Sequence, residues 1–237
     1  VLGVFPELSG PIIARPPGAG SYFSLYNARN STLTIFGLPR GGTLTSFSLL
    51  SYPDLTSAQK QLYAGILAQQ NTPSQVWSPD GSLLAFIGAM DGGFTDLYIY
   101  NPLDASQNRL TGNIGESSFP VWSPDGSAVL VQELLMNPAL GTYATQTVYY
   151  LSVDGVTLRT LYAPASQYEQ IFGWIDPATF VVASQRPAGF LEARRYLLEE
   201  RKHSQLKFAG AMDLTAFSPE KAVLAFTAQP KDKNAEG

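Results

Sequence analysis

Val76-Trp77-Ser78-Pro79-Asp80-Gly81-Ser82 is repeated residue for residue as Val121-Trp122-Ser123-Pro124-Asp125-Gly126-Ser127, and Trp122 follows Trp77 by 45 residues. Weaker copies follow as Gly173-Trp174-Ile175-Asp176-Pro177 and as Ala216-Phe217-Ser218-Pro219-Glu220. A period of about 45 residues suits a four-stranded propeller blade and is too long for the shorter helical and leucine-rich repeats. The repeat therefore predicts an all-β fold, a β-propeller with one blade per copy.

Each full copy has the chemistry of a strand, a tight turn and a second strand. Ser78 can accept a backbone hydrogen bond, and Pro79 presets φ. Asp80 suits the third turn position, and Gly81 supplies the positive φ of the fourth, so we expect a type I turn leading into a bulged hairpin. Glu220-Lys221 replaces Asp-Gly in the last copy, which predicts a different turn there. The positions with an expected structural role in the repeat are Trp77, Asp80, Gly81, Trp122, Asp125, Gly126, Trp174 and Phe217.

The segments after each turn complete the expected blade. They begin with short apolar runs, which are typical of strands buried on both faces. These predicted second strands are 83–87, 128–131, 180–183 and 222–226. Predicted third strands are 96–100, 146–151 and 194–198, and predicted fourth strands are 108–111, 157–161 and 205–208.

The motif Pro-x-Trp-Ser-Pro-Asp-Gly, followed by an apolar strand and an Ile-Tyr strand, resembles the TolB-like propeller repeat. That repeat also occurs in the propeller domains of prolyl oligopeptidase relatives. Residues 120–126 match it fully, whereas Gln75 stands where proline is expected in the first copy. The resemblance covers residues 71–228 and implies four-stranded antiparallel blades that engage protein partners through the ring.

We expect residues 1–237 to form a single propeller domain. Residues 1–70 form a degenerate N-terminal blade region, with strands predicted at 21–27, 32–36 and 43–50, and residues 229–237 form a polar tail. Residues 56–70 fit a short helix with Ser57 as its N-cap, or an alternating strand, and the helix is favoured. The count is five blades, with four to six allowed.

The two ends of the chain leave the closure of the ring open. The last copy ends after its second strand near Thr227, so either N-terminal strands complete that blade or the ring is incomplete. The chain begins at Val1 without an initiator methionine, and we expect it to have been cut from a longer one.

The composition narrows the classes of function. A chain of 237 residues with 45% hydrophobic residues and a net charge of −4 is a folded protein without the basic surface that nucleic acid requires. Its basic cluster is interrupted by glutamates and is interpreted as a solvated strand face; it comprises Arg194, Arg195, Arg201, Lys202 and Lys207. No apolar run approaches the ~20 residues that cross a bilayer, so we expect no direct membrane insertion.

The chain also lacks the motifs of several enzyme classes. It has no cysteine, and His203 is its only histidine, which excludes thiolate sites and histidine zinc sites. No Gly-x-Ser-x-Gly elbow, Walker loop or Gly-x-Gly-x-x-Gly fingerprint occurs. We therefore expect no cofactor, no metal and no enzymatic activity.

The loops that join second to third strands, and those that join successive blades, share one end of the predicted ring. They fall at 88–95, 112–118, 133–145, 163–167 and 185–193. The run 134–143 is unusually apolar for an exposed loop and indicates either a partner surface, or an extension of the strands or packing against the neighbouring blade. The candidate partner-binding residues at this end are Asp91, Phe94, Glu116, Glu133, Met136 and Tyr143.

Three hypotheses about function follow. The first, implied by the resemblance, is a non-enzymatic extracytoplasmic scaffold that binds a protein or peptide through its loops. The second is a glycan-active or glycan-binding five-bladed propeller, with acids drawn from Asp91, Asp96, Glu116 and Glu133. The third is the propeller domain of a larger enzyme, where it would act as a gate or substrate filter.

Overall fold

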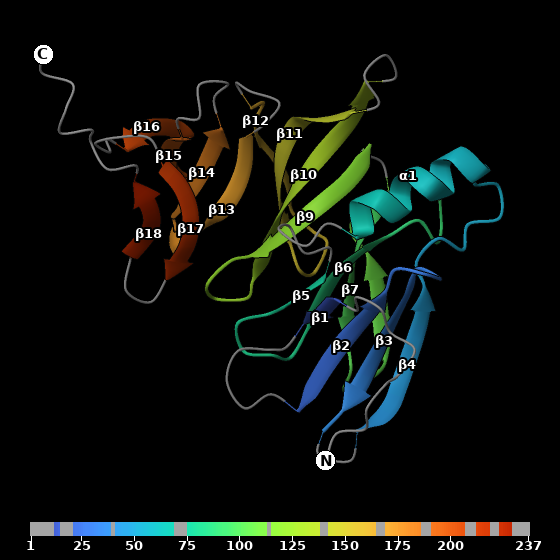
Figure 1. The fold of residues 1–237 in the computed structure, drawn as a ribbon. Coiled ribbons are helices and arrows are strands. Elements are labelled where there is room, and N and C mark those ends of the chain that lie inside the picture. Colours follow the sequence, from blue (N-terminus) through green and yellow to red (C-terminus); the bar gives the residue numbers. More distant parts are fainter. Residues whose placement is uncertain are drawn as a thin grey trace, which may run out of the picture.

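The computed structural model describes residues 12–14, 21–38, 41–68, 75–112, 115–137, 142–164, 169–185, 191–206, 212–218 and 223–228. These residues form eighteen strands and one helix, and the strands pair antiparallel in sequence order. Figure 1 shows the sheets following one another along an arc, from blue to red. The expected all-β architecture of antiparallel sheets is confirmed.

Four sheets have four strands each, and one has two. Sheet 1 contains β1 (Ile12–Ala14), β2 (Tyr22–Asn27), β3 (Thr32–Gly37) and β4 (Gly42–Ser48). Sheet 2 contains β5 (Gln75–Trp77), β6 (Leu84–Gly88), β7 (Asp96–Asn101) and β8 (Ser106–Arg109). Sheet 3 contains β9 (Glu116–Trp122), β10 (Ala128–Asn137), β11 (Thr142–Ser152) and β12 (Leu158–Tyr162). Sheet 4 contains β13 (Glu169–Asp176), β14 (Thr179–Gln185), β15 (Leu191–Leu197) and β16 (Lys202–Leu206), and sheet 5 contains β17 (Met212–Ser218) and β18 (Val223–Ala228).

Both full copies of the repeat close the same turn. In the second copy, Gly126 N donates to Ser123 O at 3.0 Å. Asp125 Oδ1 accepts from Ser123 Oγ at 2.6 Å and from Ser127 N at 3.1 Å. Gly126 has a φ of +71°, which glycine adopts without steric cost, and the first copy repeats these hydrogen bonds with Gly81 at +74°. The turn is therefore held by interactions within five residues of the chain.

The tryptophans of these two copies tie each sheet to the sheet before it. Trp77 Nε1 donates to Ser24 Oγ of β2 at 3.1 Å, and Trp122 Nε1 donates to Val76 O of β5 at 2.8 Å. The Trp77 ring also stacks on Tyr22, with ring centroids 5.8 Å apart. Both tryptophans are buried, so each satisfies its single donor inside the protein while filling the gap between two sheets.

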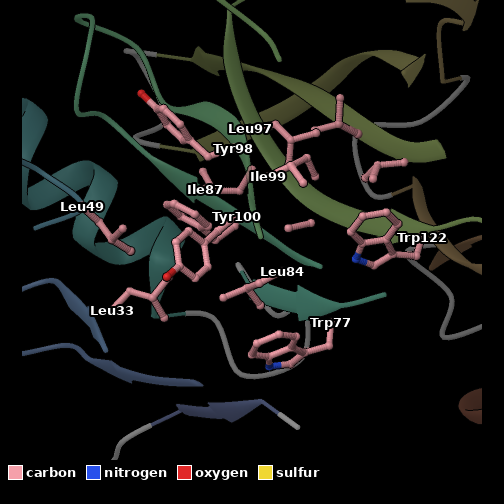
Figure 2. Packing of buried hydrophobic residues seen from close by; sticks show 14 of the residues in the cluster. Leu33, Leu49, Trp77, Leu84, Ile87, Leu97, Tyr98, Ile99, Tyr100 and Trp122 are labelled. Carbon is pink, nitrogen blue, oxygen red and sulfur yellow. The ribbon is translucent and has the colours of Figure 1, made fainter. Parts of the chain in front are cut away.

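Strand β10 shows why the second strands are apolar throughout. Val129 and Val131 belong to the hydrophobic cluster shared by sheets 1, 2 and 3 (Figure 2), whereas Leu130 belongs to the cluster shared with sheet 4. The strand thus lies between two sheets and is buried on both faces. Burying one such side chain stabilises the fold by about 1.5–3 kcal/mol.

The segment between sheets 1 and 2 forms helix α1 (Ser57–Leu67), so the favoured prediction of a helix is confirmed. The predicted N-cap, Ser57, is wrong by one residue, because Thr56 is the N-cap. Thr56 Oγ1 accepts from Gln59 N at 3.2 Å, and Gln59 Oε1 accepts from Thr56 N at 3.0 Å. This reciprocal capping box satisfies two backbone donors, which Ser57 could not do from inside the helix.

Several predicted strand limits also change. The fourth strands of sheets 2 and 4 begin earlier than predicted, at Ser106 and Lys202. The predicted loop 133–145 is wrong, because β10 continues to Asn137 and β11 begins at Thr142, so the strands extend into this run. The predicted loop 185–193 is likewise shortened by β14 and β15.

The N-terminal strand takes part in sheet 1. β1 pairs with β2, with Ile13 opposite Leu25, so it completes the first sheet and not the last one. Among the described residues, β17 and β18 pair only with each other. The predicted turn at 219–222 and the tail at 229–237 lie outside the described residues.

Candidate partner-binding loop face

Three segments meet at one end of sheets 2 and 3 (Figure 1). They are the β6–β7 loop 89–95, the connection into β9 at 110–112 and 115–117, and helix α1; we call them together the loop face. Gly93 O accepts from Tyr63 Oη at 2.8 Å and from Gln59 Nε2 at 3.4 Å, which joins the loop to the helix. Ser117 N donates to Thr95 O at 2.7 Å, and Thr95 Oγ1 donates to Ser117 O at 3.0 Å, which joins the loop to β9.

Arg109 holds the base of the β6–β7 loop. Its Nη2 and Nε lie 2.7 and 2.9 Å from Asp96 Oδ2, and its Nη1 donates to Asp91 O at 3.3 Å. The guanidinium also lies against two glycines: a Cβ at Gly92 would come within 2.7 Å of Arg109 Nη2, and a Cβ at Gly112 within 3.3 Å of its Cζ. Glycine at these two positions therefore leaves the space that Arg109 occupies.

Asp96 is a buried carboxylate, with 1% of the residue exposed. Burial raises the pKa of Asp96 to about 6, although the hydrogen bond and charge of Arg109, and a hydrogen bond from Thr111, favour the ionised form. Thr111 Oγ1 lies 3.3 Å from Asp96 Oδ1. Desolvation thus outweighs the ion pair at this site.

Glu133 has its acceptors satisfied inside sheet 3. Gly115 N donates to Glu133 Oε1 at 2.9 Å, and Tyr149 Oη donates to Oε2 at 3.1 Å. Burial, and then the charge of Glu133, raise the pKa of Tyr149. Glu133 therefore fixes the entry into β9, in addition to the partner role predicted for it.

The other two acids of the predicted site are open to solvent. Asp91 is exposed, and Glu116 is half-buried beside the Tyr63 hydroxyl. Burial, and then the charge of Glu116, raise the pKa of Tyr63 to about 12. Phe94 lies in the same loop as Asp91, with 52% of the residue exposed. The structure thus brings Asp91, Phe94, Glu116 and Glu133 to one end of sheets 2 and 3.

Met136 and Tyr143 lie opposite each other on β10 and β11, and their side chains are outside the described residues. Leu134, from the same apolar run, is buried in a cluster with Tyr63, Ile66 and Ala89. Helix α1 therefore covers part of the strand extension and accounts for the burial of Leu134. Leu135 remains 51% exposed.

Sequence reasoning missed two groups that organise this end of the protein. Tyr63, Gln59 and Arg109 hold the loop, and Gly92 and Gly112 were the signal in the sequence for the close approach of Arg109. Glu169 of β13 is buried and pairs with Arg194 of β15, while Gln132 Nε2 donates to Glu169 O at 3.2 Å. Because Arg194 is half-buried in this pair, its assignment to a solvated strand face is wrong.

In the described part of the chain, no group of three or more His, Cys, Asp or Glu side chains could hold a metal ion. No helix of the described ranges has the length and apolar character needed to span a bilayer. Burial lowers the pKa of His203, whose ring contacts Tyr162 and Tyr196 edge-on with centroids 4.5 and 4.9 Å away.

Comparison with known proteins gives short sequence matches. No family model matches the chain. It is 44% identical over 55 residues to an uncharacterized peptidase, YuxL, of Bacillus subtilis, a match covering 23% of this chain and 8% of that protein. It is 34% identical over 62 residues to the Tol-Pal system protein TolB of Alcanivorax borkumensis, covering 25% and 14%. These matches thus cover less than one sixth of either curated relative.

Solved structures match over most of the chain. TolB from Acinetobacter baumannii aligns with a TM-score of 0.50 and 14% identity, over 84% of this chain and 44% of that one. An acylaminoacyl peptidase from Pyrococcus horikoshii aligns with a TM-score of 0.56 and 12% identity, over 86% and 34%. The β-propeller domain of the Trilobed protease from Pyrococcus furiosus aligns with a TM-score of 0.53 and 14% identity, over 86% and 60%. The chain therefore has a β-propeller fold, and TolB is among its structural neighbours.

Proposed function

We propose that the chain is a non-enzymatic binding propeller that engages a protein or peptide through its loop face. The observation that carries the proposal is the exposed ring of Phe94 on a loop whose backbone is held by Tyr63, Gln59 and Arg109. Aromatic side chains are frequent anchors of protein interfaces. A loop already held in one conformation loses little entropy when a partner binds.

The contacts of the buried acids support binding rather than catalysis. Asp96 is paired with Arg109, and both carboxylate oxygens of Glu133 accept internal hydrogen bonds. Acids held in this way position the loops, whereas a glycosidase needs two carboxyl groups facing each other across an open cleft. Release of nitrophenol from a panel of nitrophenyl glycosides would instead favour the glycan-active alternative.

The proposal includes an extracytoplasmic location for the protein. The absence of cysteine is compatible with export, and a TolB sequence match points the same way. Fractionation of the source cells with an antibody against this chain tests the location. Recovery with cytoplasmic markers would contradict it.

A selection from a random peptide library displayed on phage tests the binding function. We expect enriched peptides to bind the immobilised protein, and Phe94→Ala to weaken that binding about 10-fold, as for a moderate interface anchor. Leu103→Ala is the matched control, because Leu103 is 78% exposed in the β7–β8 turn, away from the loop face. No enrichment, or equal loss in both variants, would refute the proposal.

A second candidate function is a propeller domain that filters substrates for a larger peptidase. The match to YuxL and the structural likeness to acylaminoacyl peptidase favour it. Isolation of the native protein with an antibody, followed by labelling with a fluorophosphonate probe, tests this candidate. A labelled serine hydrolase domain on the same polypeptide would support it, and an unlabelled protein would contradict it.

A further inference from the structure

The acids of the loop face outnumber its cations. Asp91 and Glu116 lie on it, and Asp96 lies directly beneath it with Arg109 as its partner. Lys60 on α1 is the remaining cation of this region. The described residues contain no ion pair to Asp91 or Glu116, so both carboxylates keep their charge available.

The negative charges of Asp91, Asp96 and Glu116 lie close enough to influence neighbouring groups in common. The charge of Asp91 raises the pKa of Asp96, and the charges of Glu116 and Asp96 both raise the pKa of Tyr63. Such interactions extend only about 8 Å at physiological ionic strength, so the three acids form one electronegative area. A negative area of this kind attracts cations and repels acidic segments.

The Tyr98 hydroxyl is an independent observation at the same place. Tyr98 is fully buried, and its hydroxyl has no hydrogen-bond partner of good geometry. After burial, the charge of Asp91 and then a hydrogen bond with the Asp91 side chain are the main causes that raise the pKa of Tyr98, followed by the charge of Asp96. Figure 2 shows the hydroxyl directed away from the other labelled side chains.

Phe94 adds the second feature that a cationic segment would meet. Its exposed ring lies three residues from Asp91 in the β6–β7 loop. Aromatic faces attract Lys and Arg side chains, and the apolar stems of those side chains pack on the ring. An acidic partner would gain the aromatic contact but would be repelled by Asp91 and Glu116.

We propose that the loop face binds a cationic peptide segment, with a Lys or Arg side chain held by Asp91 and Glu116 beside the ring of Phe94. This inference rests on the proposed binding function. It adds the chemical class of the partner, which the fold does not supply.

The test uses the peptides enriched by phage selection on the whole chain, synthesised with a fluorescent label and measured by fluorescence anisotropy. We expect Lys and Arg to be enriched in these peptides, and the double variant Asp91→Asn/Glu116→Gln to weaken binding about 10-fold, from two exposed ion pairs of up to about fivefold each. The matched control is Glu199→Gln/Glu200→Gln, which removes the same charge from exposed positions of the β15–β16 turn. Raising NaCl from 50 to 500 mM should abolish most of the difference.

The possible results separate the two proposals. Peptides that depend on Phe94 but carry no excess of Lys or Arg would overturn the inference and leave the proposed function standing. An equal loss of peptide binding in the two double variants would mean that binding depends on the overall charge of the protein. That result would also overturn the inference. No Phe94-dependent binding at all would overturn both. Thermal unfolding of each variant, followed by circular dichroism, checks that the fold is intact.

Discussion

Asp96 provides the sharpest test of the energetics described above. Its pKa of about 6 lies well above the usual aspartate value of 3.8, and each tenfold change in proton affinity corresponds to about 1.4 kcal/mol. Because the folded state binds this proton more tightly than the unfolded state, the contribution of Asp96 to stability is greatest below pH 3.8. That contribution falls as the pH rises to about 6 and then stays constant. The total change is about 3 kcal/mol.

Asp96→Asn removes this titration while keeping an oxygen that can accept from Arg109. The free energy of unfolding of the wild type, minus that of the variant, should therefore fall by about 2 kcal/mol between pH 4 and pH 7, which is most of the total change. At pH 7.5 the variant should be at least as stable as the wild type, although it has lost an ion pair. Urea unfolding followed by tryptophan fluorescence at four pH values measures the difference.

Asp104→Asn is the control for this experiment. Hydrogen bonds from Ser106 lower the pKa of Asp104, so its difference curve should have the opposite sign. A flat curve for Asp96→Asn, or one that rises with pH, would mean that the ion pair with Arg109 outweighs burial. Either result would refute the argument from desolvation.

Three further experiments test the local structure. Gly126→Ala places a Cβ at a φ of +71° and should destabilise the protein by about 1 kcal/mol. Gly65→Ala lies in helix α1, where the new Cβ meets no atom outside the helix's own backbone within 4 Å, and should stabilise the protein by up to about 1 kcal/mol. Urea unfolding compares the two variants. Thr56→Ala removes the capping box and should cost about 1 kcal/mol, seen as faster hydrogen exchange in α1, and unchanged exchange would contradict this. Trp77→Phe and Ser24→Ala, combined in a double-mutant cycle, should show a coupling of about 1 kcal/mol, and additive effects would deny the Nε1–Oγ hydrogen bond.

Features that depend on neighbouring residues could be predicted from the sequence. The repeat turn is closed by hydrogen bonds among Ser123, Asp125, Gly126 and Ser127, so a segment of five residues was sufficient to predict it. The apolar run at 128–131 predicted a strand buried on both faces because sheets pack on each side of it. Helix α1 was predicted as an element, but two adjacent residues could each serve as its N-cap, and only the bond from Gln59 N identifies Thr56.

The candidate site was predicted only in part. Asp91 and Phe94 were found because they lie in one glycine-rich loop, and Glu116 because the repeat places it at the same end of the sheets. Arg109 was missed because its partner Asp96 precedes it by 13 residues, and Glu169 was missed because Arg194 follows it by 25. A single sequence does not show which of many distant charges will meet.

The sequence by itself determined the repeat, its turns and the all-β class, because these follow from short-range hydrogen bonding and from the spacing of apolar residues. Only the tertiary structure decided that β1 joins sheet 1, that β10 extends beneath α1, and that Arg109 holds the loop bearing Phe94. Each of these depends on the burial of one surface against another that is distant in the chain. Their energies come from desolvation and packing, which exist only once the sheets have come together.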